Sequence, residues 1–427
     1  MSILSVGKHS LEDAKIVVVA KKSLHEFSFL QLLVIFWTGF VNFFSFFWML
    51  LNWQTFLSMT WRFFVAVCDW RTHLRVITGR PAIDVVFITN MRDRIDRKKF
   101  LGRFRPECGH FNGPRYWFHG ISGRTRALDV TARELMNPKI RKEAKKKFLN
   151  AVQWAGEYGA KVILLAAGTK RLFGRDGAEL KELFPDLIFS IGDNGTALLL
   201  KFETLRALRQ ADLKPADSRI AVLGPYGLLG EQIVIALKQA GYKVVGAGTN
   251  DAIRSLAKKH NIEICHTFSD MDQVDAVIAC THSEAICLNA DAVESIRHPK
   301  KKLLVVDVAE PSNFTKAEYE ECKDVVVRQD AGNAYMKGLK YVIGALSYRR
   351  FRLTRAVTFG CFAETLALFL ELRRGNDIKK VDWFAINETN MAIVEKMFKK
   401  EGIVIPSPRC FGKSVRSFNL SINGGED

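Results

Sequence analysis

The sequence predicts an α/β protein with two domains, an N-terminal α/β domain and a Rossmann-type nucleotide-binding domain, followed by a helical C-terminal part. Three observations support this fold class. Short apolar runs typical of buried strands alternate with helical segments, a glycine-rich loop joins a strand to a helix near mid-chain, and the pattern turns helical toward the end. The 427 residues are enough for roughly two to three domains with sizeable cores.

The overall charge suggests an acidic partner or surface. Apolar residues make up 48% of the chain and charged residues 25%, which fits a globular protein, while the net charge is +18 and the pI about 9.5. Anionic lipid, nucleic acid and an acidic carrier protein all fit such a charge, and we expect no nucleic acid. The basic residues form separate runs, at 92–105, 139–147, 300–302 and 349–355.

The eight cysteines indicate reduced thiols rather than a metal site. They include no CxxC pair and no Cys/His spacing that suits zinc. Unpaired thiols of this kind are typical of a cytosolic compartment. We therefore predict no bound metal. The cysteines are Cys68, Cys108, Cys265, Cys280, Cys287, Cys322, Cys361 and Cys410.

Residues 27–61 form an apolar stretch of 35 residues without a formal charge, rich in Phe, Trp and Leu. The stretch is long enough for one bilayer span of about 20 residues and too short for two. It allows three interpretations: a spanning helix, a re-entrant or interfacial anchor, or a very apolar soluble helix. We expect a membrane-associated helix or hairpin at 27–69 after a polar segment at 1–26. Basic residues on both flanks favour catalytic domains on the cytoplasmic side.

The N-terminal α/β domain is expected at 80–212. Its first strand, 83–89, is followed by a basic segment rich in Gly and Pro that extends to about residue 123. The later elements alternate, with helices at 142–158 and up to about 209 and strands at 161–166 and 187–191. Such alternation predicts a parallel sheet that is covered on both faces.

The Rossmann-type domain is expected at 213–348, and a linker at 211–218 overlaps its start. The part from 349 to 411 is predicted to be helical, and a flexible tail is expected at 412–427. Predicted strands of the Rossmann domain are 220–223, 242–245, 262–265, 274–280, 302–308 and 325–327, and predicted helices of the C-terminal part are 361–373 and 387–400.

Gly224, Gly227 and Gly230 lie directly between a predicted strand and a predicted helix. Glycines in this setting permit a tight turn and the close approach of a pyrophosphate to the helix N-terminus. Leu228 and Leu229 begin the helix, so we expect their backbone to join the cofactor site. The pattern therefore indicates a dinucleotide cofactor.

The end of the second Rossmann strand indicates which cofactor. An NAD site usually places an acid there to hold the ribose 2′-hydroxyl. Here the strand runs into Gly246-Ala247-Gly248-Thr249-Asn250-Asp251, and small residues followed by Arg254 suit a 2′-phosphate better. We therefore predict NADPH over NADH, although Asp251 is close by. The residues expected to line this cofactor are Thr249, Asn250, Arg254 and Thr281, together with the glycine loop.

Cys361 lies where a turn runs into an apolar helix, in Phe359-Gly360-Cys361-Phe362-Ala363-Glu364. Backbone N–H groups and the helix dipole at such a position favour the thiolate, which attacks activated acyl groups. The alternative is a small buried hydrophobe, because free cysteines are among the most buried residue types. The position alone leaves both interpretations open.

From about residue 83 to 411 the chain resembles the long-chain acyl-[acyl-carrier-protein] reductases, which form fatty aldehydes. Helix 360–371 is similar to the family's Cys-Phe-Ala-Glu helix with its nucleophilic cysteine, and 192–197 to a Gly-Asn-x-x-Thr-Ala turn. The loop at Gly224 has the family's form and a comparable spacing. The chain departs from the family at Asp193, where the family has Asn, at Ser312, where it has Lys, and after 330–334, where a His is missing.

The resemblance implies an NADPH-dependent reductase with an acyl-enzyme intermediate. The Cys361 thiolate would attack a long-chain thioester of acyl-carrier protein or coenzyme A, and hydride from NADPH would release the aldehyde. Glu364, one helical turn further on, would shape the site, and His282, after a Rossmann strand, is the candidate for proton transfer. The residues expected to bind substrate are Thr169, Asp193 and Thr196.

Two other hypotheses remain open. A shikimate-type dehydrogenase of a soluble metabolite would use a Lys/Asp pair in the first domain, which Lys170 and Asp193 would supply, and it gives no role to Cys361. A non-catalytic membrane-tethered protein would keep NADPH binding as a sensor. The sequence is also compatible with an oligomer.

Overall fold

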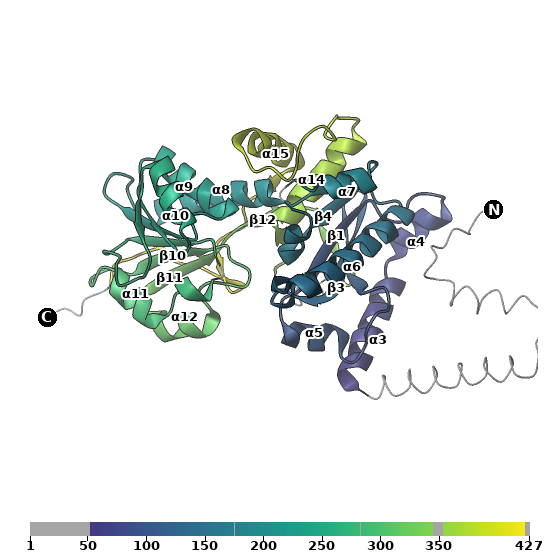
Figure 1. Cartoon of the computed structure of the whole chain (residues 1–427), viewed down its shortest axis with the longest axis horizontal. Helices are drawn as coiled ribbons and strands as arrows, with labels where there is room; N and C mark the ends of the chain where they lie inside the picture. Colours follow the sequence, from purple (N-terminus) through teal and green to yellow (C-terminus); the bar gives the residue numbers. More distant parts are fainter. Residues whose placement is uncertain (1–51, 175, 282, 345–352, 423–427) are drawn as a thin grey trace, which may run out of the picture. The chain divides into compact units, whose positions relative to one another are not determined.

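The computed structural model describes residues 52–174, 176–281, 283–344 and 353–422 (Figure 1). The predicted polar segment 1–26 and most of the membrane segment predicted at 27–69 lie outside this range. None of the helices in the described residues has the length and apolar character needed to cross a bilayer.

Residues 52–60 and 98–104 belong to a small compact unit of their own. It contains the start of α3 (Trp53–Val67) and the end of α5 (Arg94–Leu101). Gly102 has a φ of +59°, and a Cβ there would lie 2.2 Å from Oγ1 of Thr55. The same hydroxyl oxygen accepts a hydrogen bond from the N–H of Arg103 at 2.7 Å. Glycine at 102 therefore allows the two segments of this unit to meet.

The second unit begins within α3, continues with α4 (Trp70–Ile77) and contains a first large sheet with strand order β13-β2-β3-β1-β4-β5. Strands β3, β1, β4 and β5 run parallel, whereas β2 and β13 are antiparallel to their neighbours. The bounds are β1 Val85–Met91, β2 His110–Phe118, β3 Ile121–Thr131, β4 Val162–Leu165, β5 Ile188–Ser190 and β13 Lys340–Tyr341.

The hairpin of β2 and β3 was not predicted, and it replaces much of the basic segment expected up to residue 123. Its two-residue turn is His119-Gly120, both with positive φ, which is the geometry that favours tight hairpins. The sequence of these strands shows little alternation of apolar and polar residues, because the strands bury Arg115, Arg124 and Arg126. The hairpin makes the sheet mixed, where the sequence predicted a parallel one.

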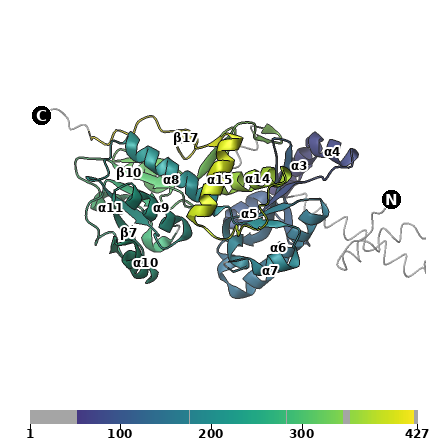
Figure 2. The same cartoon turned by 90° about the horizontal axis from the view of Figure 1, so that it is seen from above.

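Helices cover both faces of the first sheet. Val86 and Ile88 of β1 face a cluster with α6, while Val85 and Phe87 face a cluster with α8, α14 and α15. The predicted C-terminal helices are confirmed as elements, and α14 packs into this core beside α15 (Figure 2). The bounds are η2 Glu134–Met136, α6 Pro138–Glu157, η3 Ala167–Leu172, α7 Ala178–Leu183, α8 Asp193–Gln210, α14 Gly360–Arg373 and α15 Glu388–Glu401.

The second large sheet has strand order β11-β10-β9-β6-β7-β8 and is parallel throughout. This is the Rossmann-type arrangement that the sequence predicted, and all six predicted strands are present. The bounds are β6 Arg219–Leu223, β7 Lys243–Ala247, β8 Glu263–Cys265, β9 Ala276–Ala279, β10 Leu303–Asp307 and β11 Val326–Asp330.

Alternating residues of these strands face two cores, because successive side chains point to opposite faces. Ile220 and Val222 pack with α8 and α9, while Ala221 and Leu223 pack with α11 and α12, which lie below the sheet in Figure 1. The bounds are α9 Leu228–Gln239, α10 Ala252–His260, η4 Glu284–Ile286, α11 Ala290–Ile296 and α12 Lys316–Cys322.

The C-terminal residues up to 422 are packed, where a flexible tail was expected from 412. Phe418 and Leu420 join the core around α9, and Ser421 forms a bridge with Lys301. Their apolar side chains provide the burial that holds this segment. The remaining strands form two small sheets, β14 Val357–Phe359 with β12 Asn333–Met336 and β15 Ile403–Val404, and β16 Arg409–Cys410 with β17 Lys413–Ser414.

Candidate active site

A lysine and an aspartate meet at the carboxyl ends of β4 and β5. Lys170 lies in η3, directly after β4, and Asp193 is the first residue of α8, directly after β5. Parallel strands end at the same edge of a sheet, and Nζ of Lys170 forms an ion pair with Oδ1 of Asp193. The Asp193 side chain is 7% exposed, whereas that of Lys170 is 26% exposed and reaches solvent.

Three glycines let the start of α8 approach the start of α14. Gly192 has a φ of +71°, and a Cβ there would lie 2.3 Å from Cβ of Cys361. A Cβ on Gly195 would lie 2.9 Å from Cβ of Glu364, and one on Gly360 would meet the backbone of Gly332 and α8. Only hydrogen fits at these positions, so the predicted substrate turn and the cysteine helix are in direct contact.

Cys361 lies beside the ion pair as a neutral thiol. Burial raises the pKa of Cys361 to about 12, and the carboxyl groups of Asp193 and Glu364 act in the same direction. The charge of Lys170 and the N–H of Phe362 act the other way and only partly offset this rise. The thiol therefore keeps its proton at neutral pH, in contrast to the thiolate expected from its place at a helix start.

Glu364 ties three elements together from a fully buried position. Its Oε1 accepts a hydrogen bond from the hydroxyl of Ser190 at 2.7 Å, and its Oε2 accepts one from the N–H of Gly195 at 2.6 Å. Burial raises the pKa of Glu364 to about 7, while these two hydrogen bonds lower it by less. Glu364 thus holds α14 against β5 and α8.

Lys170 is the cation of this site. Burial alone would lower its pKa, but the charge of Asp193, the hydrogen bond to Asp193 and the Glu364 carboxyl together raise the pKa above its ordinary value. Lys170 is therefore an ammonium at neutral pH, able to donate a proton to an oxygen that gains negative charge.

Thr169 and Thr196, both expected to bind substrate, use their hydroxyls within the protein. The Thr169 hydroxyl lies 2.7 Å from the carbonyl oxygen of Ala166 and is fully buried. The Thr196 hydroxyl donates to the carbonyl oxygen of Gly192 at 3.0 Å, which closes the first turn of α8. Both residues lie within the site, but their hydroxyls bind backbone carbonyl oxygens of the protein.

Two further residues of the site were not singled out in the sequence. Asn90, in β1, accepts a hydrogen bond on Oδ1 from the N–H of Gly168 at 2.8 Å and so fixes the start of η3 before Lys170. Ser190, at the end of β5, positions Glu364. A polar residue at the carboxyl end of a parallel strand is the signal that could have pointed to both.

The glycine loop after β6 has the geometry that a dinucleotide requires. Gly224 has a φ of +74°, and a Cβ on Gly230 would lie only 2.2 Å from the carbonyl oxygen of Gly224. Gly227 directly precedes α9, whose first N–H groups, on Leu228 and Leu229, have no partner within the helix. A pyrophosphate fits such a loop, because backbone approaches it closely at the positive end of the helix dipole.

The residues expected to select NADPH lie together at the end of β7. Thr249 and Asn250 are exposed, and Oδ1 of Asn250 accepts from the N–H of Ala252 at 2.8 Å. Arg254 is exposed in the first turn of α10. Tyr226, which the sequence analysis did not single out, lies against Gly248, where a Cβ would come within 2.5 Å of its ring.

Thr281 lies against the glycine loop, as expected for a residue of the cofactor site. A Cβ on Gly224 would lie 2.6 Å from Cβ of Thr281. The carbonyl oxygen of Thr281 accepts a hydrogen bond from Nδ2 of Asn313 at 2.9 Å. His282, the predicted proton-transfer residue, lies outside the described residues.

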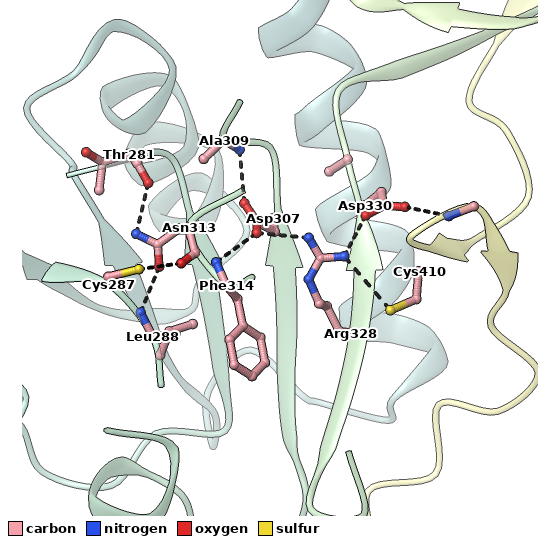
Figure 3. A network of polar contacts seen from close by, with 12 residues as sticks. Thr281, Cys287, Leu288, Asp307, Ala309, Asn313, Phe314, Arg328, Asp330 and Cys410 are labelled. Carbon is pink, nitrogen blue, oxygen red and sulfur yellow. Dashed lines mark hydrogen bonds and ion pairs between the residues drawn. The ribbon is translucent and has the colours of Figure 1, made fainter. Parts of the chain in front are cut away.

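Asn313 fixes the loop that follows β9 (Figure 3). Besides Thr281, its Nδ2 donates to the carbonyl oxygen of Ile286 at 2.9 Å, and its Oδ1 accepts from the N–H of Leu288 at 3.1 Å. Asn313 is 1% exposed. One amide side chain therefore spans the loop on both sides of residue 282.

Asp307, the last residue of β10, and Arg328, in the middle of β11, form a second cation–carboxylate pair (Figure 3). Nη2 of Arg328 lies 2.9 Å from Oδ2 of Asp307, and the two side chains are 1% and 0% exposed. Asp307 also accepts hydrogen bonds from the N–H groups of Ala309 and Phe314. Burial alone would lower the pKa of Arg328, but Asp307 and Asp330 raise it above its ordinary value.

No group of His, Cys, Asp and Glu side chains in the described part of the chain has the arrangement needed to hold a metal ion.

Comparison with known proteins bears on the second domain. The family model for shikimate / quinate 5-dehydrogenases matches residues 206–329, from the end of α8 into β11. The chain is a Rossmann-type oxidoreductase. A nicotinamide cofactor is the group that dehydrogenases of this kind use, and the glycine loop after β6 fits it.

Three solved structures are similar to parts of the chain. L-tryptophan dehydrogenase from Nostoc punctiforme has 8% identity over 75% of this chain and 80% of its own, with a TM-score of 0.38. Shikimate 5-dehydrogenase from Thermus thermophilus has 14% identity over 75% of this chain and 100% of its own, with a TM-score of 0.33. Dipicolinate synthase A chain from Bacillus subtilis has 16% identity over 40% and 56%, with a TM-score of 0.29, so only about half of its length is spanned. No curated protein sequence matched the chain.

Proposed function

We propose that the protein is an NAD(P)-dependent dehydrogenase of the shikimate type, which interconverts a secondary alcohol and a ketone of a soluble metabolite. The observation that carries this proposal is the ion pair of Lys170 and Asp193 at the carboxyl ends of two parallel strands. The family match over 206–329 supports it from the nucleotide domain. This was the alternative hypothesis of the sequence analysis, and the acyl-thioester reductase becomes the second candidate.

The proposed chemistry follows from the charge of Lys170. In the direction of reduction, the ammonium of Lys170 donates a proton to the carbonyl oxygen as it becomes an alkoxide, and solvent restores the proton. Asp193 holds the ammonium in place and stabilises its charge. The nicotinamide, when bound at the loop 224–230, supplies the hydride to the carbonyl carbon. The reverse direction returns the hydroxyl proton to a neutral Lys170.

We propose NADPH as the cofactor. The exposed Arg254 at the start of α10 is the cation that would bind a 2′-phosphate, with Thr249 and Asn250 beside it. Arg254→Gln should raise the KM for NADPH by about tenfold, since an ion pair with a phosphate is lost, and leave the KM for NADH unchanged. Lys258→Gln, an exposed cation later in α10, is the matched control.

The decisive test replaces the lysine of the pair. Lys170→Met should lower kcat for a panel of small secondary alcohols and hydroxy acids by a factor on the order of 10²–10⁴. Lys181→Met removes another lysine paired to an aspartate, Asp382, at 2.9 Å on the surface and should change kcat by less than about twofold. Equal activity of the Lys170 variant and the wild type would rule out the proposed proton transfer.

The second candidate function is the acyl-thioester reductase implied by the resemblance. The observation in its favour is that Lys170 and the N–H of Phe362 both act on the Cys361 thiol in the direction of thiolate. In that reaction the Cys361 sulfur, after losing its proton, bonds to the acyl carbon and the thiolate of acyl-carrier protein or coenzyme A leaves. A hydride that NADPH would supply then adds to the same carbon, the C–S bond breaks with the electron pair returning to the Cys361 sulfur, and the aldehyde departs.

Cys361→Ser separates the two candidates. A dehydrogenase should keep its alcohol oxidation within about threefold, because the thiol takes no part in proton transfer. A thioester reductase should lose both aldehyde formation and the acyl adduct on Cys361 seen by intact-mass analysis after incubation with a long-chain acyl thioester. An adduct that NADPH discharges would decide for the reductase.

A further inference from the structure

The helices before the first strand expose an unusually apolar surface. Between residues 61 and 80, the end of α3 and all of α4 carry a set of large apolar side chains that are each more than half exposed. We call this set the α3–α4 face, and it consists of Phe63, Phe64, Val67, Trp70, Leu74, Val76 and Ile77.

The amphipathic character of α4 is inverted. A surface helix normally buries its apolar side and exposes its polar side. Here the polar side chains are directed into the domain: Asp69, before α4, accepts hydrogen bonds from Arg115 and Trp117. The Thr72 hydroxyl lies 2.9 Å from that of Ser122. Polar contacts thus attach α4 to the sheet and leave its apolar side outward.

Arg75 completes this attachment. Its guanidinium binds both carboxylate oxygens of Asp84, at 2.5 and 2.6 Å, and Nε donates to the carbonyl oxygen of Pro81. Such two-pronged pairing fixes the orientation of the helix about its own axis. The apolar side of α4 is therefore held outward by geometry.

The formal charges that residues 52–83 expose are all positive. Asp69 is the only acidic residue between positions 52 and 83, and it is 1% exposed. Arg80 is exposed, and the guanidinium of Arg71 lies over the ring of Trp70 at 5.2 Å from its centroid. An apolar surface with a basic rim and an aromatic at its edge is the chemistry that suits the headgroup region of an anionic membrane.

We propose that the α3–α4 face docks the protein on an anionic membrane surface, with α4 lying in the interface. Two other occupants fit less well. A second copy would present the same basic residues, Arg71 and Arg80, and its residues 52–83 carry no exposed acid to pair with them. The chain's stretch 27–61 carries no negative charge to pair with them, and it is itself apolar enough to seek the same lipid surface.

The test compares two triple variants of the full chain that match in residue type and exposure. Leu74→Ser, Val76→Ser and Ile77→Ser remove side chains that are 53%, 56% and 81% exposed. The control removes Leu183, Val404 and Ile95, which are 52%, 52% and 78% exposed, in the same way. Binding is measured by co-sedimentation with phosphatidylcholine vesicles that contain about one third phosphatidylserine.

The α4 triple variant should bind these vesicles at least about tenfold more weakly than the wild type, and the control triple within about twofold. Arg71→Gln and Arg80→Gln should each weaken binding by about fivefold on the anionic vesicles and leave the weaker binding to pure phosphatidylcholine unchanged. Melting temperatures of all variants, measured in parallel, confirm that they fold.

Three results would overturn the proposal. One is vesicle binding by the α4 triple variant that equals that of the wild type, which would show that other parts of the chain bind the membrane. Another is equal binding of the wild type to anionic and neutral vesicles. The third is a wild type that is dimeric in size-exclusion chromatography without lipid while the α4 triple variant is monomeric, which would assign the face to a second copy.

Discussion

The two large sheets each carry a cation–carboxylate pair whose carboxylate lies at the carboxyl end of a parallel strand, and the two pairs differ in kind. In the first sheet, Lys170 remains 26% exposed beside Asp193. In the Rossmann sheet, Arg328 is 1% exposed beside Asp307, and its guanidinium lies 3.9 Å from the ring centroid of Phe411. A carboxylate at a strand end therefore belongs to a titratable, solvent-accessible pair in the first sheet and to a buried pair in the Rossmann sheet.

The difference teaches what each pair can do. A lysine ammonium exchanges its proton, whereas an arginine remains charged and serves best as a rigid, multidentate connector. Asp307 accepts from Arg328 and from the N–H groups of Ala309 and Phe314, so the Rossmann pair fixes the loop after β10. We interpret the lysine pair as the reactive one and the arginine pair as structural.

The largest effect is expected from Lys170→Arg. The variant keeps the positive charge and the ion pair but loses a proton that can be exchanged, so kcat of the proposed dehydrogenase should fall by about a thousandfold. Thermal unfolding should be almost unchanged. Lys181→Arg, on the surface pair with Asp382, serves as control. If the Lys170 variant kept full activity, charge alone would be sufficient and the comparison would fail.

A large effect on stability is expected from Arg328→Met. The substitution leaves Asp307 buried without its cation, and the free energy of unfolding measured in urea should fall by about 3 kcal/mol. Arg219→Met is the control, because Arg219 pairs with Glu263 and Asp272, which are 70% and 92% exposed, and it should cost less than about 1 kcal/mol. Similar losses for both arginines would contradict a structural role specific to Arg328.

The pH dependence of stability should reflect Glu364, next to the reactive pair. Burial raises its folded-state pKa to about 7 from an ordinary value of 4.5, so the folded protein keeps a proton that the unfolded chain has lost. The contribution of Glu364 to the free energy of unfolding is therefore fully present below pH 4.5 and is lost as the pH rises to 7. Glu364→Gln should remove a decline of about 3 kcal/mol, measured by urea unfolding at several pH values.

Glu371 lies two turns further along α14, and its pKa is shifted in the opposite direction. Burial alone would raise its pKa, but Lys400, Asn376 and Arg374 lower it below its ordinary value. Its contribution is present above the unfolded-state pKa and is lost as the pH falls. Glu371→Gln should therefore leave the decline between pH 4.5 and 7 intact. A decline that persists in Glu364→Gln would show that it has another source.

The smallest effect concerns the loop held by Asn313. Asn313→Ala removes the acceptor of the Leu288 N–H and should speed hydrogen exchange at that amide by about tenfold, with a loss of about 1–2 kcal/mol in stability. The neighbouring control Asn289→Ala removes the cap of α11 and should act instead at Ala292. Unchanged exchange at Leu288 would show that the loop does not depend on Asn313.

The sequence predicted the Rossmann sheet almost completely, because each of its strands is a short apolar run between turn residues. Gly224 and Gly230 lie in a tight turn between a strand and a helix, as their spacing predicted, and this turn has a direct steric reason. The hairpin of β2 and β3 was missed for the converse reason. Its buried positions are filled by Arg124 and Arg126, which no apolar pattern reveals.

The candidate site was predicted in its parts but not in its assembly. Cys361 and Asp193 were both singled out, yet nothing in the sequence shows that Gly192 lies against Cys361, because the contact joins residues far apart in the chain. The helix start favours the thiolate, but burial has the larger effect and raises the pKa of the Cys361 thiol to about 12. Lys170 appeared only within the alternative hypothesis, since a single lysine has no sequence signature of its own.

The C-terminal residues up to 422 also bear on how this protein can be handled. Phe411 covers Arg328, while Phe418 and Leu420 fill the core beside α9. Proteolytic cleavage near residue 406 would therefore remove the cover of a buried charge and part of a hydrophobic core in one step. A fragment ending there should be prone to aggregate. Loss of the C-terminal peptide, seen by mass analysis, would therefore indicate that the nucleotide domain is destabilised.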